Sequence, residues 1–402
     1  VVLLVTVGFL LYDLQIIWSQ MPGAVLTLGV AMLSFSTLGL AVAALAPSLQ
    51  AATAMANGFV IPLAFISDMF IVSGDLPDWL EAIGWFFPLK HLVYALSDAF
   101  NPFVDAGFDV THVVVIAAWG LVGVLLFLWG IRRTTSATER GSKAGRARSG
   151  GSGSGKAVKG RASDRGPRRD GRPSAPALVG DQVLHANQAQ WRDWSSPVFG
   201  LAMPVFLVML LPTVFSGGDE ELRLVIAQTV AATMTIYGAG VIALVNMPSF
   251  IAEAREAGVL KRWAGTPLPT WAILSGRAVA AVLMALLVML LAYALAVPVY
   301  GVVIPSSWPS GLVVLLVSTI SFSALGMAIV SVVHGEQSVL AVSLGSLITL
   351  SFFSDIFIIG ADFPDWLDAI SWFFPLRHAV NAFVDAMAVD ASGVVLGWDH
   401  LA

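Results

Sequence analysis

Cysteine is absent from this sequence, and charged residues make up only 12% of it. Without thiols the chain forms no disulfide, no thiolate metal site and no cysteine nucleophile. An average soluble domain carries about twice this share of charge, whereas 57% of these residues are hydrophobic. Several apolar runs approach the roughly 20 residues with which a helix crosses a bilayer. Their continuous apolarity favours membrane helices over barrel strands.

Catalytic motifs are absent as well. The sequence has no HExxH, no GxSxG and no metal-spaced cluster among its 6 histidines. Residues 150–157 imitate a phosphate-binding loop, but Ala157 stands where Ser or Thr would hold Mg²⁺, and no strand precedes the stretch. No soluble α/β segment has the length of a nucleotide-binding domain. We therefore expect no enzyme activity, metal or cofactor in this chain, and no nucleic-acid partner.

The most informative feature that is present is a repeat. Residues 67–100 recur as residues 354–387 without a gap, with 21 of 34 positions identical at an offset of 287. Pro-Asp-Trp-Leu and Trp-Phe-Phe-Pro-Leu occur in both copies, and the match extends upstream. There, Ser34, Ser36 and Gly39 recur as Ser321, Ser323 and Gly326. A period this long indicates a duplicated domain, in which such small residues pack membrane helices together.

The apolar runs predict an all-α integral membrane protein made of two tandem six-helix modules. We expect residues 1–131 to be the C-terminal part of the first module, 132–180 a linker, and 181–402 a second module without its last span. The chain then reads as truncated at both ends. The expected spans are residues 1–11, 24–46, 51–72 and 112–130 in copy one, and 197–216, 224–245, 271–297, 311–333 and 338–360 in copy two.

Basic residues predict the orientation. Thirteen of the 21 Lys and Arg residues lie between Arg132 and Arg172, and four more (Arg255, Lys261, Arg262 and Arg277) lie in or beside the loop at residues 251–270. Counting spans places both regions on one side, which the positive-inside rule makes cytoplasmic. The Gly, Ser and Arg of the linker predict disorder. It is either a basic tether to anionic lipid or a plain flexible connection.

The loop at residues 251–270 is the second informative stretch. At helical spacing Ala252, Val259, Leu260 and Trp263 share one arc, which predicts an imperfectly amphipathic helix ended by Pro267. One interpretation is an interfacial helix on the inner leaflet. The other is a docking helix for a soluble partner. The residue pattern alone leaves both open.

Residues 253–268 read E-A-R-E-A-G-V-L-K-R-W-A-G-T-P-L, and this pattern resembles the signature loop of ABC-2 type permeases, the membrane subunits of ABC exporters. The resemblance implies a coupling helix that contacts a nucleotide-binding subunit, expected in two copies, in which ATP and Mg²⁺ would be bound. The resemblance also implies export. The apolar spans, with few charges inside them, lead us to expect a drug, lipid or glycolipid as cargo, and the expected location is a bacterial cytoplasmic membrane. One departure is the fusion, because members usually carry one module per chain. The positions implied to make the contact are Glu253, Arg255, Glu256, Gly258, Leu260, Arg262, Trp263, Thr266 and Pro267.

The repeated segment that begins with Pro-Asp-Trp-Leu is too short to span, yet it is rich in aromatic residues. It fits a folded cap at the headgroup boundary, and the resemblance implies a re-entrant outer gate. Each copy also places a basic pair, Lys90-His91 or Arg377-His378, before an acid, Asp98 or Asp385. The gate positions are Pro77, Trp79, Trp85, Phe86, Phe87 and Pro88, and then Pro364, Trp366, Trp372, Phe373, Phe374 and Pro375.

Asp68 and Asp355 lie between apolar residues near the outer end of an expected span. A charge inside a bilayer is costly and marks a functional candidate, so both are pathway candidates or partners of a nearby base. The alternative is a carboxylate that is simply wet. For the whole chain, two other functions stay open: an ATP-independent carrier or channel, and a membrane anchor with a vestigial loop.

Overall fold

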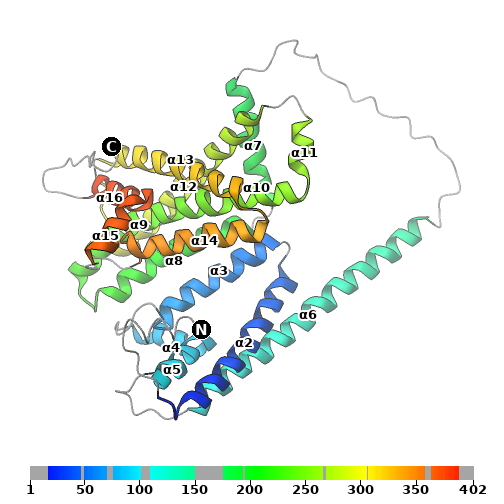
Figure 1. Cartoon of the computed structure of the whole chain (residues 1–402), viewed down its shortest axis with the longest axis vertical. Coiled ribbons are helices and arrows are strands. Elements are labelled where there is room, and N and C mark those ends of the chain that lie inside the picture. The colour runs from blue at the N-terminus through cyan, green and yellow to red at the C-terminus, as the bar shows by residue number, and fades with distance from the viewer. Residues whose placement is uncertain are drawn as a thin grey trace. The chain divides into compact units, whose positions relative to one another are not determined.

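The computed structural model describes residues 17–46, 49–69, 76–100, 109–149, 175–192, 195–265, 269–305, 307–357 and 364–388. Over these ranges the chain forms helices joined by short turns and contains no strand (Figure 1). The expected all-α fold is therefore confirmed. The chain divides into two compact units. The first consists of residues 1–56, 63–70 and 79–174, and the second of residues 57–62, 71–78 and 175–402.

The first part of the chain forms α2 (Met21–Leu45), α3 (Leu49–Ile66), α4 (Asp78–Phe86), α5 (Pro88–Phe100) and α6 (Val110–Ser149). Helices α2 and α6 lie side by side (Figure 1). Small residues allow this approach, since a Cβ on Gly123 would lie 2.7 Å from the Leu38 nitrogen. The buried Ser34 hydroxyl also donates to the Ile116 carbonyl at 2.7 Å. Of the small residues expected to pack, Ser34 does so in this copy, whereas Ser36 and Gly39 are exposed and no heavy atom lies within 4 Å of a Cβ at Gly39. In the second copy Ser323 and Gly326 are buried.

The second part forms α7 (Ala175–Arg192), α8 (Ser195–Phe215), α9 (Glu220–Gly240), the π-helical turn η1 (Val241–Asn246), α10 (Met247–Glu256), α11 (Val259–Ala264), α12 (Thr270–Tyr300), α13 (Trp308–Val332), α14 (Glu336–Phe353), α15 (Asp365–Phe373) and α16 (Pro375–Ala386). Helix α9 begins at an Asp219 cap whose side chain accepts from the Glu221 and Leu222 amides. It continues through η1 into α10. This rod is the buried centre of the unit, and α8, α12, α13 and α16 all contact α9.

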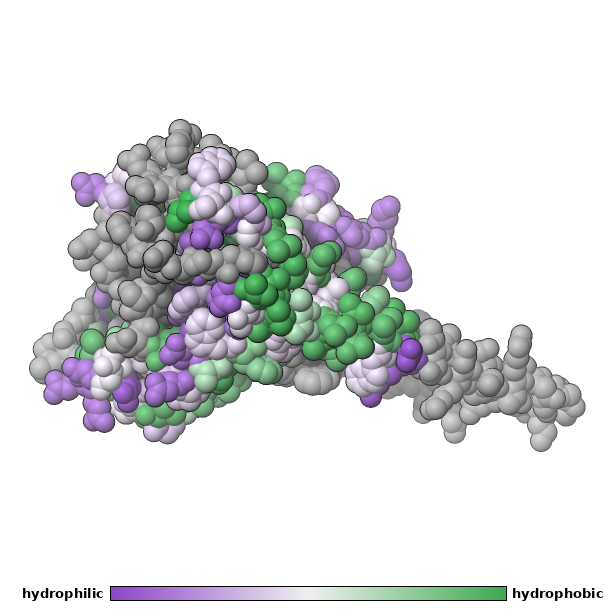
Figure 2. Space-filling view, turned by 90° about the horizontal axis from the view of Figure 1, so that it is seen from below, coloured by the Kyte–Doolittle hydropathy of each residue, from purple (hydrophilic) through white to green (hydrophobic). Residues whose placement is uncertain are grey.

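Six helices of the described chain are long and apolar enough to cross a membrane: Met21–Leu45, Val110–Arg133, Glu220–Glu256, Trp271–Tyr300, Trp308–Val332 and Glu336–Phe353. The spans expected at 51–72 and 197–216 correspond to shorter apolar helices, Ala51–Ile66 and Leu201–Phe215. The span expected at 1–11 lies outside the described residues. Large apolar side chains such as Leu33, Leu121 and Leu290 are exposed. Figure 2 shows hydrophobic residues uncovered over wide parts of one face, as a lipid-facing surface requires.

The repeat has the same local structure in both copies. Helices α2 and α13 begin at residues 21 and 308, α3 and α14 at 49 and 336, α4 and α15 at 78 and 365, and α5 and α16 at 88 and 375. Each of these pairs keeps the offset of 287. The two copies therefore form the same series of four helices at matching positions, although many of their residues differ.

The expected linker differs from the structure at both edges. Helix α6 continues to Ser149, and α7 begins at Ala175, so residues 132–149 and 175–180 are helical. Ala, Arg, Lys and Glu in the first stretch are good helix formers, and extending an existing helix avoids the cost of nucleation. The rest of the linker, residues 150–174, lies outside the described part.

Candidate functional sites

The repeated acids Asp68 and Asp355 occupy the same unusual position. Each follows the end of a helix, α3 or α14, and each has a positive φ, 56° and 57°. The next amide bonds back to the helix, from Met69 to the Ala64 carbonyl at 3.2 Å and from Ile356 to the Ser351 carbonyl at 3.3 Å. This is the Schellman pattern, whose left-handed position is usually glycine. Aspartate tolerates that backbone better than most residues but still at a cost.

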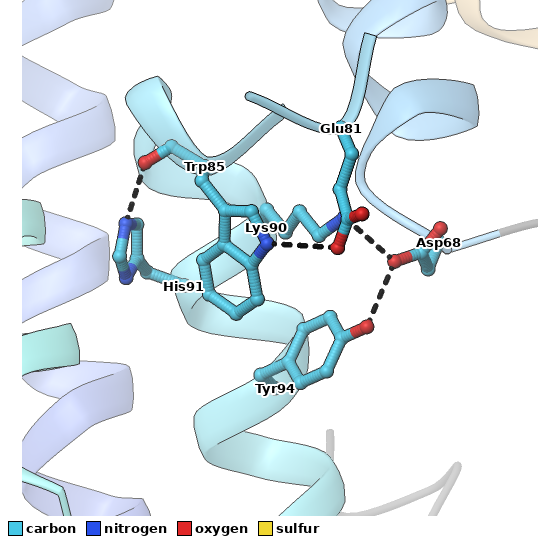
Figure 3. A network of polar contacts seen from close by, with 6 residues as sticks. All are labelled: Asp68, Glu81, Trp85, Lys90, His91 and Tyr94. Carbon is cyan, nitrogen blue, oxygen red and sulfur yellow. Dashed lines mark hydrogen bonds and ion pairs between the residues drawn. The ribbon is translucent and has the colours of Figure 1, made fainter. Parts of the chain in front are cut away.

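In the first copy Asp68 is the centre of a polar cluster (Figure 3). The Lys90 ammonium, buried on α5, lies 3.0 Å from an Asp68 carboxylate oxygen. The Tyr94 hydroxyl donates to the same oxygen at 3.0 Å. Glu81 lies 3.9 Å from the ammonium, and the Trp85 ring faces it with its centroid 5.0 Å away. Burial and the bond to Asp68 raise the pKa of Tyr94 to about 12, so the phenol stays a donor.

The second copy builds the same cluster with arginine. Arg377 lies 2.7 Å from Asp368 but 3.8 Å from Asp355, and its guanidinium is 5.0 Å from the Trp372 ring centroid. It also donates to the Phe353 carbonyl and the Ser371 hydroxyl. Burial raises the pKa of Asp355, and the nearby guanidinium offsets this only in part. The base is therefore held chiefly by Asp368 in this copy and chiefly by Asp68 in the other.

One small residue accounts for part of this difference. Gly84 lies where a Cβ would be 2.7 Å from the Ile66 carbonyl oxygen and 3.0 Å from Cδ of Lys90. The equivalent residue in the second copy is Ser371, whose hydroxyl bonds to Arg377 instead. Tyr94 is likewise replaced by Asn381. The two copies keep the charges of the cluster but fill the space around them differently.

The histidines of the basic pairs point away from the acids. Nε2 of His91 bonds to the Trp85 carbonyl at 2.8 Å, and Nε2 of His378 bonds to the Trp372 carbonyl at 2.7 Å. A carbonyl only accepts, so each Nε2 carries the proton. Nδ1 of His91 then lies 2.9 Å from Nδ1 of His112 on α6. Burial is the largest cause that lowers the pKa of His91.

The predicted gate residues lie on or beside the helix pairs that carry the basic side chains of these clusters. Pro77 and Pro364 lie directly before α4 and α15, and Pro88 and Pro375 begin α5 and α16. Trp85 and Trp372 face the cationic side chains, whereas Trp79, Phe86, Trp366 and Phe373 are exposed. Phe87 and Phe374 stand in the turns and contact Phe86 and Phe373 edge to face. These positions are those of an aromatic helix pair, and their role as a gate stays a prediction.

The α10–α11 loop differs from the single helix expected. Helix α10 ends at Glu256 and α11 begins at Val259, because Gly258 adopts φ 68° and its amide bonds to the Arg255 carbonyl. Glu253 and Arg262 are exposed, and Leu260 is half-buried. Trp263 lies in α11, while Thr266 and Pro267 lie outside the described residues. The exposed residues of this stretch thus lie at the end of α10 and in α11, and their contact with a partner stays a prediction.

Two of the predicted loop residues make bonds within the chain. Arg255 donates to the Val330 carbonyl at 2.8 Å and to the Val333 carbonyl at 2.9 Å. The Glu256 carboxylate accepts from the Glu336 amide at 2.7 Å. Neither bond has a sequence signal, because each joins residues about 80 positions apart. Whether these residues also contact a partner stays a prediction.

In the described part of the chain, no three His, Asp or Glu side chains gather as metal ligands would.

A family model described as ABC-2 type transporter matches residues 1–101 and 184–388, which is more than half of the chain. Neither the comparison with curated proteins nor that with solved structures found a match. The described residues include six helices long and apolar enough to span a membrane, and the chain belongs to the ABC-2 type transporter family and is a multi-pass membrane permease of an ABC transporter.

Proposed function

We propose that this chain is the membrane component of an exporter that moves a hydrophobic or amphipathic cargo, such as a drug, lipid or glycolipid. The family implies an ABC ATPase subunit as partner. Two copies of that subunit would bind ATP and Mg²⁺, and their closure would drive alternating access. The two repeats would act as two permease modules fused in one chain, residues 1–131 and 181–402. The proposed location is a bacterial cytoplasmic membrane, in which lipid contacts the chain.

The observation that carries this proposal is the α10–α11 loop. It begins in α10, the last part of the buried rod from Glu220 to Glu256, and continues through α11. This rod is the most buried candidate span. Its exposed Lys261 and Arg262 can pair with an acidic cleft. Arg255 and Glu256 place the loop at the same end of the unit as the turn between α13 and α14. A partner that moves this loop therefore acts on the centre of the unit.

The distribution of charge supports both the orientation and the cargo class. The loop and the continuation of α6 are basic, whereas α9 begins with Asp219, Glu220 and Glu221 at the other end of the rod. The positive-inside rule then makes the loop cytoplasmic. Within the six candidate spans, charged residues lie only within about two turns of an end. An apolar interior favours an apolar cargo over the charge relay that an ion-coupled carrier would use.

The test is co-purification of the chain from native membranes in mild detergent, with ATP hydrolysis assayed on the product. We expect a bound ATPase that is lost in Arg262→Glu and in Trp263→Asp. Glu221→Lys is the matched control, a charge reversal at the exposed opposite end of the same rod, and it should retain the ATPase. If the parent chain purifies alone, or if all three variants retain the ATPase equally, the proposal is wrong.

A further inference from the structure

Arg255 completes the end of α13. The last carbonyls of a helix have no partner within it and must be satisfied from outside. The Arg255 guanidinium, from α10, donates one N–H to the Val330 carbonyl and another to the Val333 carbonyl, at 2.8 and 2.9 Å. A cation at this end also lies favourably in the field of the helix dipole.

Glu256, the next residue, completes the start of α14. The residue before this helix is Gly335, which has φ 91° and no side chain to act as a cap. The Glu256 carboxylate takes that place and accepts from the Glu336 amide at 2.7 Å. A carboxylate at a helix N-terminus is favourable for the same electrostatic reason. Two consecutive residues of α10 thus satisfy the end of one helix and the beginning of the next.

Apolar packing lies beneath these bonds. Ala252 of α10, Val330 of α13 and Val339 of α14 are all buried in one cluster. With no side-chain volume beyond a methyl group, Ala252 lets α10 lie close to both helices. The polar bonds and the apolar contact join the same three helices.

We infer that Arg255 and Glu256 are positioning residues that fix the α13–α14 turn to α10, so that a displacement of the α10–α11 loop is passed along α14. The far end of α14 carries Asp355 and its bond network with Arg377. Arg255 and Glu256, together called the clamp, would thus connect the α10–α11 loop with the polar cluster of Asp355 and Arg377. This inference rests on the proposed function for the source of the displacement, but the fixation of the turn stands on the bonds alone.

The displacement is tested by a distance measurement on the ATPase-bound complex. The chain has no cysteine, so Leu222→Cys on α9 and Thr349→Cys on α14, both exposed, can carry spin labels without further changes. With ATP and vanadate we expect the distance between labels to change in the parent. Arg255→Ala and Glu256→Ala should each reduce the change at least fivefold, measured on the fraction of each variant that carries bound ATPase. Arg255→Lys, which keeps the charge and a donor, should restore at least half of it.

A merely structural role would lower the thermal midpoint without removing the response of the folded complex. If both alanine variants retain the full distance change, the inference is wrong. It is equally wrong if the parent complex hydrolyses ATP and the labels do not move.

The fixation is tested without the ATPase by hydrogen exchange on the chain in detergent. We expect the Glu336 amide, which donates to Glu256, to exchange at least tenfold faster in Glu256→Ala than in the parent. Unchanged protection there would contradict the clamp even if the partner is present. If protection is lost in Glu256→Ala but no ATPase co-purifies with the parent chain, the inferred fixation of the turn stands and the proposed function is wrong.

Discussion

Asp68 and Asp355, 287 residues apart, end two different helices with the same left-handed backbone, at φ 56° and 57°. They are the two described residues other than glycine that have a positive φ. Elsewhere the chain uses glycine for this purpose, as at Gly301 after α12. Both copies carry a carboxylate where glycine would fit the backbone better. This indicates that the interactions of the side chain stabilise the fold by more than the strained backbone destabilises it. In both copies that side chain faces a cation.

Asp68→Asn should destabilise the chain more than Asp355→Asn. The first change leaves the buried Lys90 ammonium with only Glu81, 3.9 Å away, whereas Arg377 keeps Asp368 at 2.7 Å. Removing one partner of a buried pair costs about 3 kcal/mol, and loss of a weaker, more exposed pair about 1 kcal/mol or less. Thermal unfolding in detergent measures both variants. Equal losses of stability would show that the two clusters are equivalent.

Glycine at the same positions separates strain from charge. Asp355→Gly removes an unfavourable backbone, worth about 1 kcal/mol, and a weak ion pair, so we expect little change or a slight gain in stability. Asp68→Gly loses the bonds to Lys90 and Tyr94 as well and should be clearly less stable. The midpoints of the two variants are compared with those of the asparagine variants. A gain at Asp68 would mean that its ion pair contributes nothing.

Gly84→Ala should destabilise the first cluster through crowding. The new methyl group would lie 2.7 Å from the Ile66 carbonyl oxygen, and overpacking of this kind costs about 1–3 kcal/mol. Gly39→Ala on α2 is the control, because no heavy atom lies within 4 Å of that site in the structure. We expect the control to be neutral or slightly stabilising. Similar losses in both would point to a general intolerance of glycine replacement.

Acid should destabilise the chain through His91. Its pKa in the folded chain is lowered, chiefly by burial, so below about pH 6.5 the unfolded chain binds more protons than the folded one. The contribution is fully present above that pH and is lost as the pH falls through the lowered pKa. His112 and Asp109 are the titratable neighbours. The thermal midpoint of His91→Gln should therefore approach that of the parent between about pH 7 and pH 5. A constant difference would contradict the assignment.

The helices were predictable because bilayer length and apolarity act on each segment by itself. The repeat even predicted that α4 and α15 would match. Pairing with a nearby base was one of the alternatives that the sequence left open for Asp68 and Asp355, and the structure pairs Asp68 with Lys90. The sequence did not show that Arg377 would lie closer to Asp368 than to Asp355. In each copy this geometry depends on two breaks between helices, those that separate α3, α4 and α5 in the first copy, and on the left-handed backbone at Asp68 or Asp355. No local sequence pattern encodes it.

The loop shows the same limit. The resemblance placed Arg255 among the residues that contact a partner, which implied an accessible surface charge. In the structure it lies against the end of α13, where free carbonyls attract it. Gly258 could have indicated the break, since glycine is the usual residue at the left-handed end of a helix. Its positive φ separates α10 from α11.

The most direct measurement is site-specific cross-linking to the ATPase subunit. Because the chain has no cysteine, a photoreactive maleimide attached at Lys261→Cys reports only on the α10–α11 loop. The same reagent at Glu221→Cys, at the other exposed end of the rod, is the control. We predict a cross-link from position 261 to an ATPase subunit in native membranes and none from position 221. A cross-link from 221 alone, or from neither position in membranes that contain the ATPase, would contradict the permease mechanism proposed for this chain.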